Sequence, residues 1–211
     1  MGAEGYQVAM FARSAERLRE LQDEISGSRG YAVDVGDAQA VREAFDRVRA
    51  DLGPIEVLLH NAGSGVFGSF LDTTPEGLEQ SWRTNTLGLM LCAKEGCSDM
   101  LAAGKGTIVV TGATASLRGG ANFAAFASAK AAQRSLAQSM ARSLGPKGIH
   151  VAYVVVDGVI DIPRTRALMP ERPDDKFLRP EDIASSVFHL VQQGRSAWTF
   201  ELDLRPFTEQ W

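Results

Sequence analysis

Short apolar segments alternate along the chain with longer segments of helical periodicity, and this alternation limits the fold more than any other feature. The short segments are rich in Val and Ile and are apolar throughout, which is typical of strands that helices cover on both faces. We therefore expect an α/β fold, a doubly wound parallel sheet in three layers, α/β/α. The expected strands are 6–12, 31–35, 55–63, 106–113, 149–156 and 198–204, and the expected helices are 15–25, 38–53, two within 74–103, 122–145 and 180–193.

The composition is that of an ordinary globular protein. The chain has 211 residues, of which 45% are hydrophobic and 23% are charged, so we expect a single domain over residues 1–211. A net charge of -4 argues against a nucleic-acid partner, and no apolar run is long enough to cross a membrane. Cys92 and Cys97 fall in a helical pattern and are expected to be reduced, and no signal peptide is recognised, so the expected location is cytoplasmic. His150 and His189 have no nearby Cys or His partners, and we expect no metal site.

Small and polar residues follow each expected strand. In a doubly wound sheet, ligands bind beyond the carboxyl ends of the strands, so these residues should converge on one edge. They are Arg13-Ser14, Asp34-Val35, His60-Asn61-Ala62-Gly63, Thr111-Gly112-Ala113-Thr114 and Asp157-Gly158-Val159. The pattern predicts a binding site at that edge.

Several motifs in the right order and spacing resemble those of a known family. They are "HNAG" at 60–63, "RTNTLG" at 83–88, "FASAK" at 126–130, "VDGVI" at 156–160 and "LRPEDIASSVFHLV" at 178–191. Together they are similar to the classical short-chain dehydrogenases/reductases over essentially the whole chain. The resemblance implies a Rossmann-like fold and hydride transfer between a nicotinamide cofactor and an alcohol or carbonyl group of a small molecule.

The resemblance also implies roles for single residues. Lys130 would bind the nicotinamide ribose, which explains a lone lysine on an apolar helix face better than a surface role does. Arg13 is either an ordinary surface arginine or the partner of an adenosine 2'-phosphate, which favours NADP over NAD. Asp34 either caps a turn or faces the adenine. The implied catalytic residues are Asn85, Thr114 and Lys130, and the implied cofactor-binding residues are Arg13, Ser14, Asp34, Val35, Asn61, Ala62, Gly63, Lys130 and Val159.

Two motif positions depart from the family. Phe126 stands where the family has its proton-donating tyrosine, and a phenyl ring has neither an acid nor a base. Ala113 stands at the position of the motif serine, with Thr114 as the nearest hydroxyl and Ser116 as a poorer substitute. Two hypotheses follow. The chain is an NADP(H)-dependent oxidoreductase in which Thr114, Lys130 or a water molecule supplies the proton, or it is a catalytically silent member that binds a ligand or a partner subunit.

The family pattern begins with a strand and a Gly-rich turn that cradles the cofactor's pyrophosphate, and this sequence has neither. Strands 6–12 and 55–63 then either close the gap between them or keep unpaired backbone edges that make the chain marginally stable and prone to aggregation. We expect weak or undetectable NADPH binding that becomes tight once about thirty upstream residues, one βα unit, are restored. The family also implies a homodimer or homotetramer. The Ala-rich helix around 124–132 and the aromatic residues Phe207 and Trp211 are the expected contact surfaces.

Overall fold

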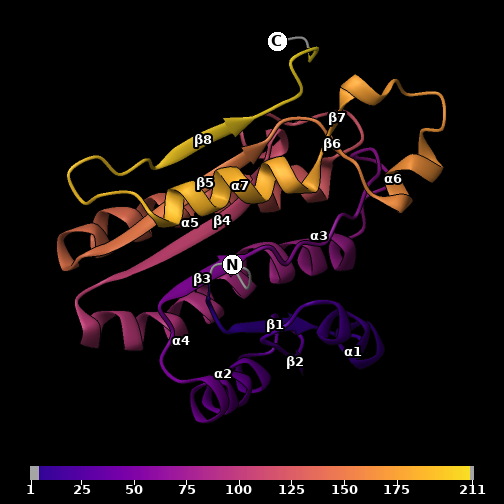
Figure 1. Cartoon of the computed structure of the whole chain (residues 1–211). Helices are drawn as coiled ribbons and strands as arrows, with labels where there is room; N and C mark the ends of the chain where they lie inside the picture. The colour runs from indigo at the N-terminus through magenta and orange to yellow at the C-terminus, as the bar shows by residue number, and fades with distance from the viewer. Residues whose placement is uncertain (1–4, 210–211) are drawn as a thin grey trace.

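The middle layer of the molecule is made of parallel strands. A computed structural model describes residues 5–209 (Figure 1). All its strand pairs are parallel, which confirms the expected α/β class. The largest sheet has the order β3-β4-β5-β8, and two further sheets contain β1-β2 and β6-β7. The strands are β1 (Val8–Ala12), β2 (Ser28–Ala32), β3 (Val57–His60), β4 (Gly106–Ala113), β5 (Ile149–Val156), β6 (Val159–Ile160), β7 (Phe177–Leu178) and β8 (Glu201–Leu204).

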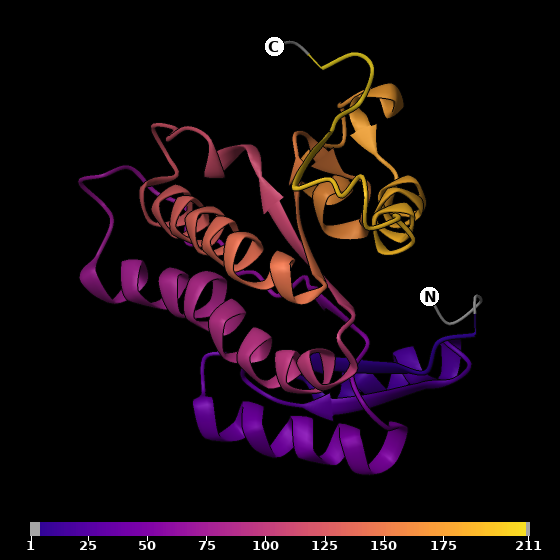
Figure 2. The same cartoon turned by 90° about the vertical axis from the view of Figure 1, so that its left-hand side faces the viewer.

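Helices cover both faces of the largest sheet (Figures 1 and 2). Alternate residues of β5 enter two different cores, because successive side chains of a strand point to opposite faces. Val151, Tyr153 and Val155 pack with residues of α4 and α5, whereas Ala152 and Val154 pack with residues of α7. The three expected layers are therefore confirmed. The helices are α1 (Ala15–Glu24), α2 (Ala38–Leu52), α3 (Pro75–Trp82), α4 (Gly88–Ala103), α5 (Ala124–Leu144), α6 (Pro163–Leu168) and α7 (Pro180–Val191).

Some element boundaries differ from the expected ones. The second strand runs over Ser28–Ala32 rather than 31–35, because the Asp34 carboxylate accepts a bond from the Gly36 amide and bends the chain before α2. Val33 and Val35 are nevertheless buried in the core beside α2. The last strand is confined to Glu201–Leu204. The segment between β5 and α7, expected as a loop, also contains α6, β6 and β7.

The sheet is interrupted between β1 and β3. These two strands belong to different sheets, so the expected unpaired edges are present in the structure. The burial of the strand residues shows the same interruption. All five residues of β1 are only half-buried and Leu59 of β3 is 42% exposed, whereas Ile108 and Val110 of β4 are fully buried. Apolar strand residues beside the interruption therefore lack the cover that the rest of the sheet has.

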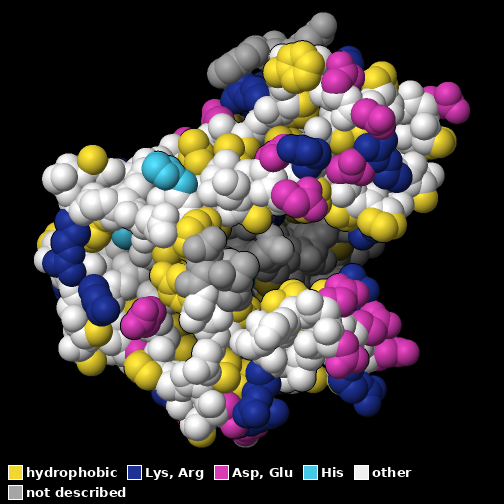
Figure 3. Space-filling view, viewed as in Figure 1, with side chains coloured by type: hydrophobic (Ala, Val, Ile, Leu, Met, Phe, Trp, Pro, Cys, Tyr) yellow, Lys and Arg dark blue, Asp and Glu magenta, His cyan; other side chains and the backbone are white. Residues whose placement is uncertain are grey.

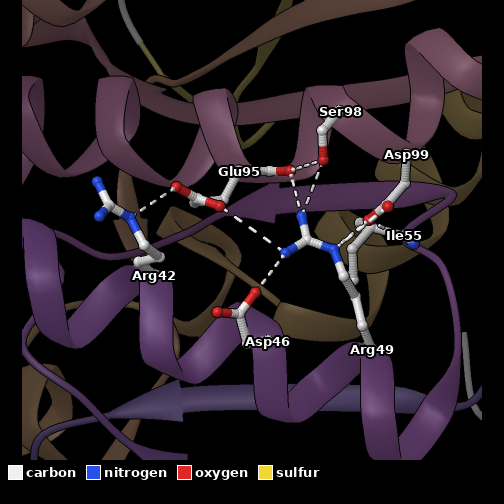
Figure 4. A network of polar contacts seen from close by, with 7 residues as sticks. All are labelled: Arg42, Asp46, Arg49, Ile55, Glu95, Ser98 and Asp99. Carbon is white, nitrogen blue, oxygen red and sulfur yellow. Dashed lines mark hydrogen bonds and ion pairs between the residues drawn. The ribbon is translucent and has the colours of Figure 1, made fainter.

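Helix contacts hold the two sheets together across this interruption. Arg49 of α2 donates from Nε to both carboxylate oxygens of Asp99 on α4, at 3.2 and 3.0 Å (Figure 4). It also donates from Nη2 to the Glu95 carbonyl at 2.7 Å and to the Ser98 hydroxyl at 3.0 Å. Asp99 in turn accepts from the amide of Ile55, just before β3. A charge-assisted network thus joins α2, which follows β2, to the helix that packs beside β3.

Two surfaces bear on the expected assembly. Of the alanines in the 124–132 segment, Ala125, Ala127 and Ala129 are buried inside the fold, so only the remaining ones can meet a partner. Phe207 is 89% exposed, and Trp211 lies outside the described residues. By contrast with these two surfaces, the outer face of α1 is covered by charged side chains (Figure 3). The oligomeric state remains a prediction.

Among the described residues, no helix is both long and apolar enough to span a bilayer.

Candidate functional site

Lys130 lies on α5 with its ammonium group inside the protein. The side chain is 5% exposed, and Nζ donates to the carbonyl of Thr111 on β4 at 2.9 Å and to Oε1 of Gln133 at 3.1 Å. Burial lowers the pKa of Lys130 to about 8, because it disfavours the charged form. The amine is therefore mostly protonated at pH 7 and loses its charge as the pH rises through about 8.

Asn85 lies opposite Lys130, in an irregular turn of helix. The turn over Arg83–Leu87 has π geometry, a form that occurs often at functional sites. The Asn85 side-chain amide donates to the carbonyls of Ser81 and Ser64 at 2.8 and 2.9 Å. Its Oδ1 is buried and has no hydrogen-bond partner among the described residues.

Gly63 leaves a small open space next to these two groups. A Cβ added at Gly63 would lie 3.5 Å from Asn85 Oδ1 and 4.0 Å from Lys130 Nζ. An unpartnered acceptor and a cationic donor therefore face one point at the carboxyl edge of the sheet. A hydroxyl group, which both donates and accepts, matches that pair.

His60, at the end of β3, is buried close to Lys130. It is 3% exposed, and its Nε2 has no partner among the described residues. Burial first and the nearby Lys130 charge second lower its pKa to about 4. The ring is neutral at pH 7, so it adds no second positive charge beside Lys130.

Three phenyl rings form one wall above Lys130. Phe67 contacts both Phe123 and Phe126 edge to face, with centroids 5.5 and 5.4 Å apart. The Phe126 centroid lies 5.9 Å from Lys130 Nζ, so residue 126 occupies the place where a proton donor next to Lys130 would stand. The Gly68 amide donates to the Asn122 carbonyl and fixes the Phe67 loop against this wall. The wall offers contact surface but no proton.

Thr114 belongs to a second polar group. Its hydroxyl donates to Asp157 Oδ1 at 2.5 Å, and Asp157 Oδ2 lies 3.6 Å from Arg205 Nε. The hydrogen of Thr114 is therefore directed to a carboxylate. Ser116, the other hydroxyl considered, donates to the Ala113 carbonyl.

A third group surrounds Arg13. Arg13 and Asp34 line one pocket together with Arg83, whose Nη2 donates to the Gly36 carbonyl at 3.2 Å. Two arginines suit a phosphate. However, four carboxylates line the same pocket and would repel one, and they belong to Asp34, Asp37, Glu76 and Glu79.

The remaining predicted cofactor-binding residues are spread along this edge. Ser14 caps α1 by accepting from the Arg17 amide, and Val35 is buried against Gly88. Val159 pairs with Phe177 between β6 and β7. Asn61 is exposed, and Ala62 is half-buried against the core cluster that contains Val33 and Val35. The structure thus brings Gly63, Asn85 and Lys130 together and leaves the other predicted residues in separate groups. Among the described residues, no cluster of side chains suits a metal ion.

Gln133 and Tyr153 were not predicted, although both contact the site. Gln133 is fully buried and bonded to Lys130, and the Tyr153 hydroxyl lies 3.4 Å from Gln133 Oε1. The spacing of Gln133, three residues after Lys130 on one helix, was the signal available in the sequence.

Comparisons with known proteins identify the class. The short chain dehydrogenase family model matches residues 1–173, and the chain belongs to this family. It is 38% identical to a solved short-chain dehydrogenase from Rhodopseudomonas palustris, with a TM-score of 0.82 over 98% of this chain and 89% of that one.

Two curated relatives have the same percentage identity to this chain. Carbonyl reductase [NADPH] 2 of Sus scrofa is 31% identical over 205 residues, which cover 92% of this chain and 82% of the relative. An inactive 2-(S)-hydroxypropyl-CoM dehydrogenase 2 of Xanthobacter autotrophicus is also 31% identical, over 89% of this chain and 87% of the relative. A relative named as a reductase and a relative named as inactive thus share the same percentage identity with this chain.

Proposed function

We propose that the chain binds NADP(H) and acts on a small alcohol or carbonyl compound. The observation that carries the proposal is the corner where Gly63, the unpartnered Asn85 Oδ1 and Lys130 Nζ face one point. In this role Lys130 and Asn85 bind the hydroxyls of the nicotinamide ribose. The aromatic wall of Phe67, Phe123 and Phe126 keeps water from the nicotinamide and offers an apolar surface to the substrate. The bound cofactor would supply or accept the hydride.

The residues fit the two ends of the cofactor better than its middle. In this role Arg13 and Arg83, which line one pocket with Asp34, provide positive charge for an adenosine 2'-phosphate, and Asp34 accepts from the adenine amino group. The carboxylates in the same pocket oppose the 2'-phosphate, so NADP and NAD must be compared directly. The sequence contains no Gly-rich turn of the T-G-x-x-x-G-x-G type to cradle the pyrophosphate. We expect weak binding for this reason.

A second candidate function is ligand binding without turnover. Two features of the site favour it. Phe126 has no proton to give, and the Thr114 hydrogen is directed to Asp157. General acid–base help is typically worth about 10²- to 10⁴-fold in rate, so a site without a donor would be slow even with its cofactor bound.

One experiment separates the two candidates. NADPH oxidation is followed with a panel of aliphatic and aromatic aldehydes and ketones at millimolar NADPH, for the parent chain and for Lys130→Met. Turnover in the parent that falls at least tenfold in Lys130→Met would support the oxidoreductase. Nucleotide binding with no turnover on any substrate would select the binding protein, and neither binding nor turnover at millimolar NADPH would contradict both.

A further inference from the structure

Gln133 bridges the two main elements of the candidate site. It lies on α5, three residues after Lys130, and is fully buried. Its Oε1 accepts from Lys130 Nζ at 3.1 Å, while its Nε2 donates to the main-chain carbonyl of Asn85 at 2.9 Å. One side-chain amide thus connects the lysine on α5 to the π turn that carries Asn85.

The chemistry of an amide fixes the direction of both bonds. Because the Asn85 carbonyl can only accept, the NH₂ group of Gln133 must face it, and Oε1 is left to face the ammonium. Lys130 then has two oxygen acceptors, from Gln133 and Thr111. An ammonium has three N–H groups, so one remains for a ligand.

No other described side chain offers Lys130 a hydrogen-bond acceptor. The titratable groups near it are His60, which is neutral at pH 7, and Tyr153, whose pKa burial raises to about 12. The Tyr153 hydroxyl lies 3.4 Å from both the Lys130 carbonyl and Gln133 Oε1, and it supports the amide from β5. Without Gln133 the buried ammonium would keep a single oxygen acceptor, and an incompletely bonded buried charge is costly.

We propose that Gln133 is the positioning residue of the site, which keeps Lys130 charged and directs its remaining N–H toward the ligand. An amide does not give up or take a proton at neutral pH, so this contact stabilises the cation without passing protons to it. At pH 7 Lys130 therefore presents a positive charge and one N–H group to the ligand. The importance of Lys130 rests on the proposed function, but the bridge itself does not.

The test is the titration of Lys130 in the protein without nucleotide. The chain has only five lysines, so the ¹³Cε resonance of Lys130 in lysine-labelled protein is assigned from the Lys130→Arg variant. Gln133→Met has a similar volume but no oxygen acceptor. In this variant the pH midpoint of the Lys130 titration should fall by about one unit, a tenfold loss of proton affinity. In Gln133→Glu, whose carboxylate keeps an acceptor, it should rise.

One control isolates the bridge. Gln138→Met makes the same change on the same helix at a half-buried position and should leave the Lys130 midpoint unchanged. If Gln133→Met does not fold, the Gln133→Glu titration decides alone. A midpoint that stays at the parent value in a folded Gln133 variant would overturn the proposal. Since no nucleotide is present, failure of the proposed function would leave this result unaffected.

Discussion

Phe126→Tyr combined with Ala113→Ser should raise NADPH-dependent carbonyl reduction by about 10²- to 10⁴-fold, the usual worth of general acid–base catalysis. The Phe126 ring centroid is 5.9 Å from Lys130 Nζ, so a hydroxyl on this ring would lie near an ammonium that stabilises its ionised form. Ala113, at the end of β4, would gain a second hydroxyl at the same edge of the sheet. The rates are compared at equal millimolar NADPH on the same panel of substrates.

The matched control changes another ring of the same wall. Phe123→Tyr with Ala113→Ser adds the same two hydroxyls, but Phe123 contacts Phe67 and is 42% exposed, and no contact with Lys130 is found for it. This variant should stay at the parent rate. If the Phe126→Tyr variant is as inactive as the control on every substrate, the missing tyrosine is not what limits the chemistry.

The second large effect concerns the interruption of the sheet. Arg49→Met should speed amide hydrogen exchange in β1 and β2 by about 10- to 100-fold, because hydrogen bonds to charged groups contribute about 1.5–3 kcal/mol and each tenfold corresponds to 1.4 kcal/mol. Arg49 supplies the short, charge-assisted hydrogen bonds between α2 and α4, while β1 and β3 share no backbone pairing. The amides of β4 and β5, which pair along eight residues in the buried core, should exchange as in the parent.

Arg42→Met is the control for this measurement. Arg42 lies on the same helix, but its contact with Glu95 is 3.9 Å long and its side chain is 71% exposed, so the change should be close to neutral. Equal acceleration in all strands of the Arg49 variant would mean that the two sheets open as one unit. That outcome would contradict the prediction that β1 and β2 open separately from β4 and β5.

Much of this fold could be predicted from the periodicity alone. β4 and β5 were predicted with their observed boundaries, because both are continuous apolar runs that end at small or polar residues. The second strand was misplaced because Val33 and Val35 look like strand residues. Their burial comes from packing beside α2, while the Asp34 side chain turns the backbone away from β1. Apolar residues at every second position indicate burial, but they do not show that the segment forms hydrogen bonds with a neighbouring strand.

The candidate site could be predicted only in part. Lys130 and Asn85 were identified by motif and do lie together. The Thr114–Asp157 bond and the Gln133 bridge join residues 43 and 48 positions apart, and no local pattern encodes such contacts. The carboxylates around Arg13 come from two segments of the chain, 34–37 and 76–79, so their effect on a 2'-phosphate could be seen only in the structure.

The central claim is that the corner of Gly63, Asn85 and Lys130 binds the nicotinamide ribose. Saturation-transfer NMR with millimolar NADPH tests it most directly, because the method detects weak ligands and reports which end of the ligand contacts the protein. The parent should saturate the nicotinamide, ribose and adenine protons. Saturation of the nicotinamide end should decline from pH 7 to pH 9, since the pKa of Lys130 is about 8 and its charge is lost in that range. Lys130→Met should lose the nicotinamide signals and keep those of adenine, while the exposed Lys94→Met should match the parent. Nicotinamide saturation that is unchanged in Lys130→Met, or absent in the parent, would contradict the account.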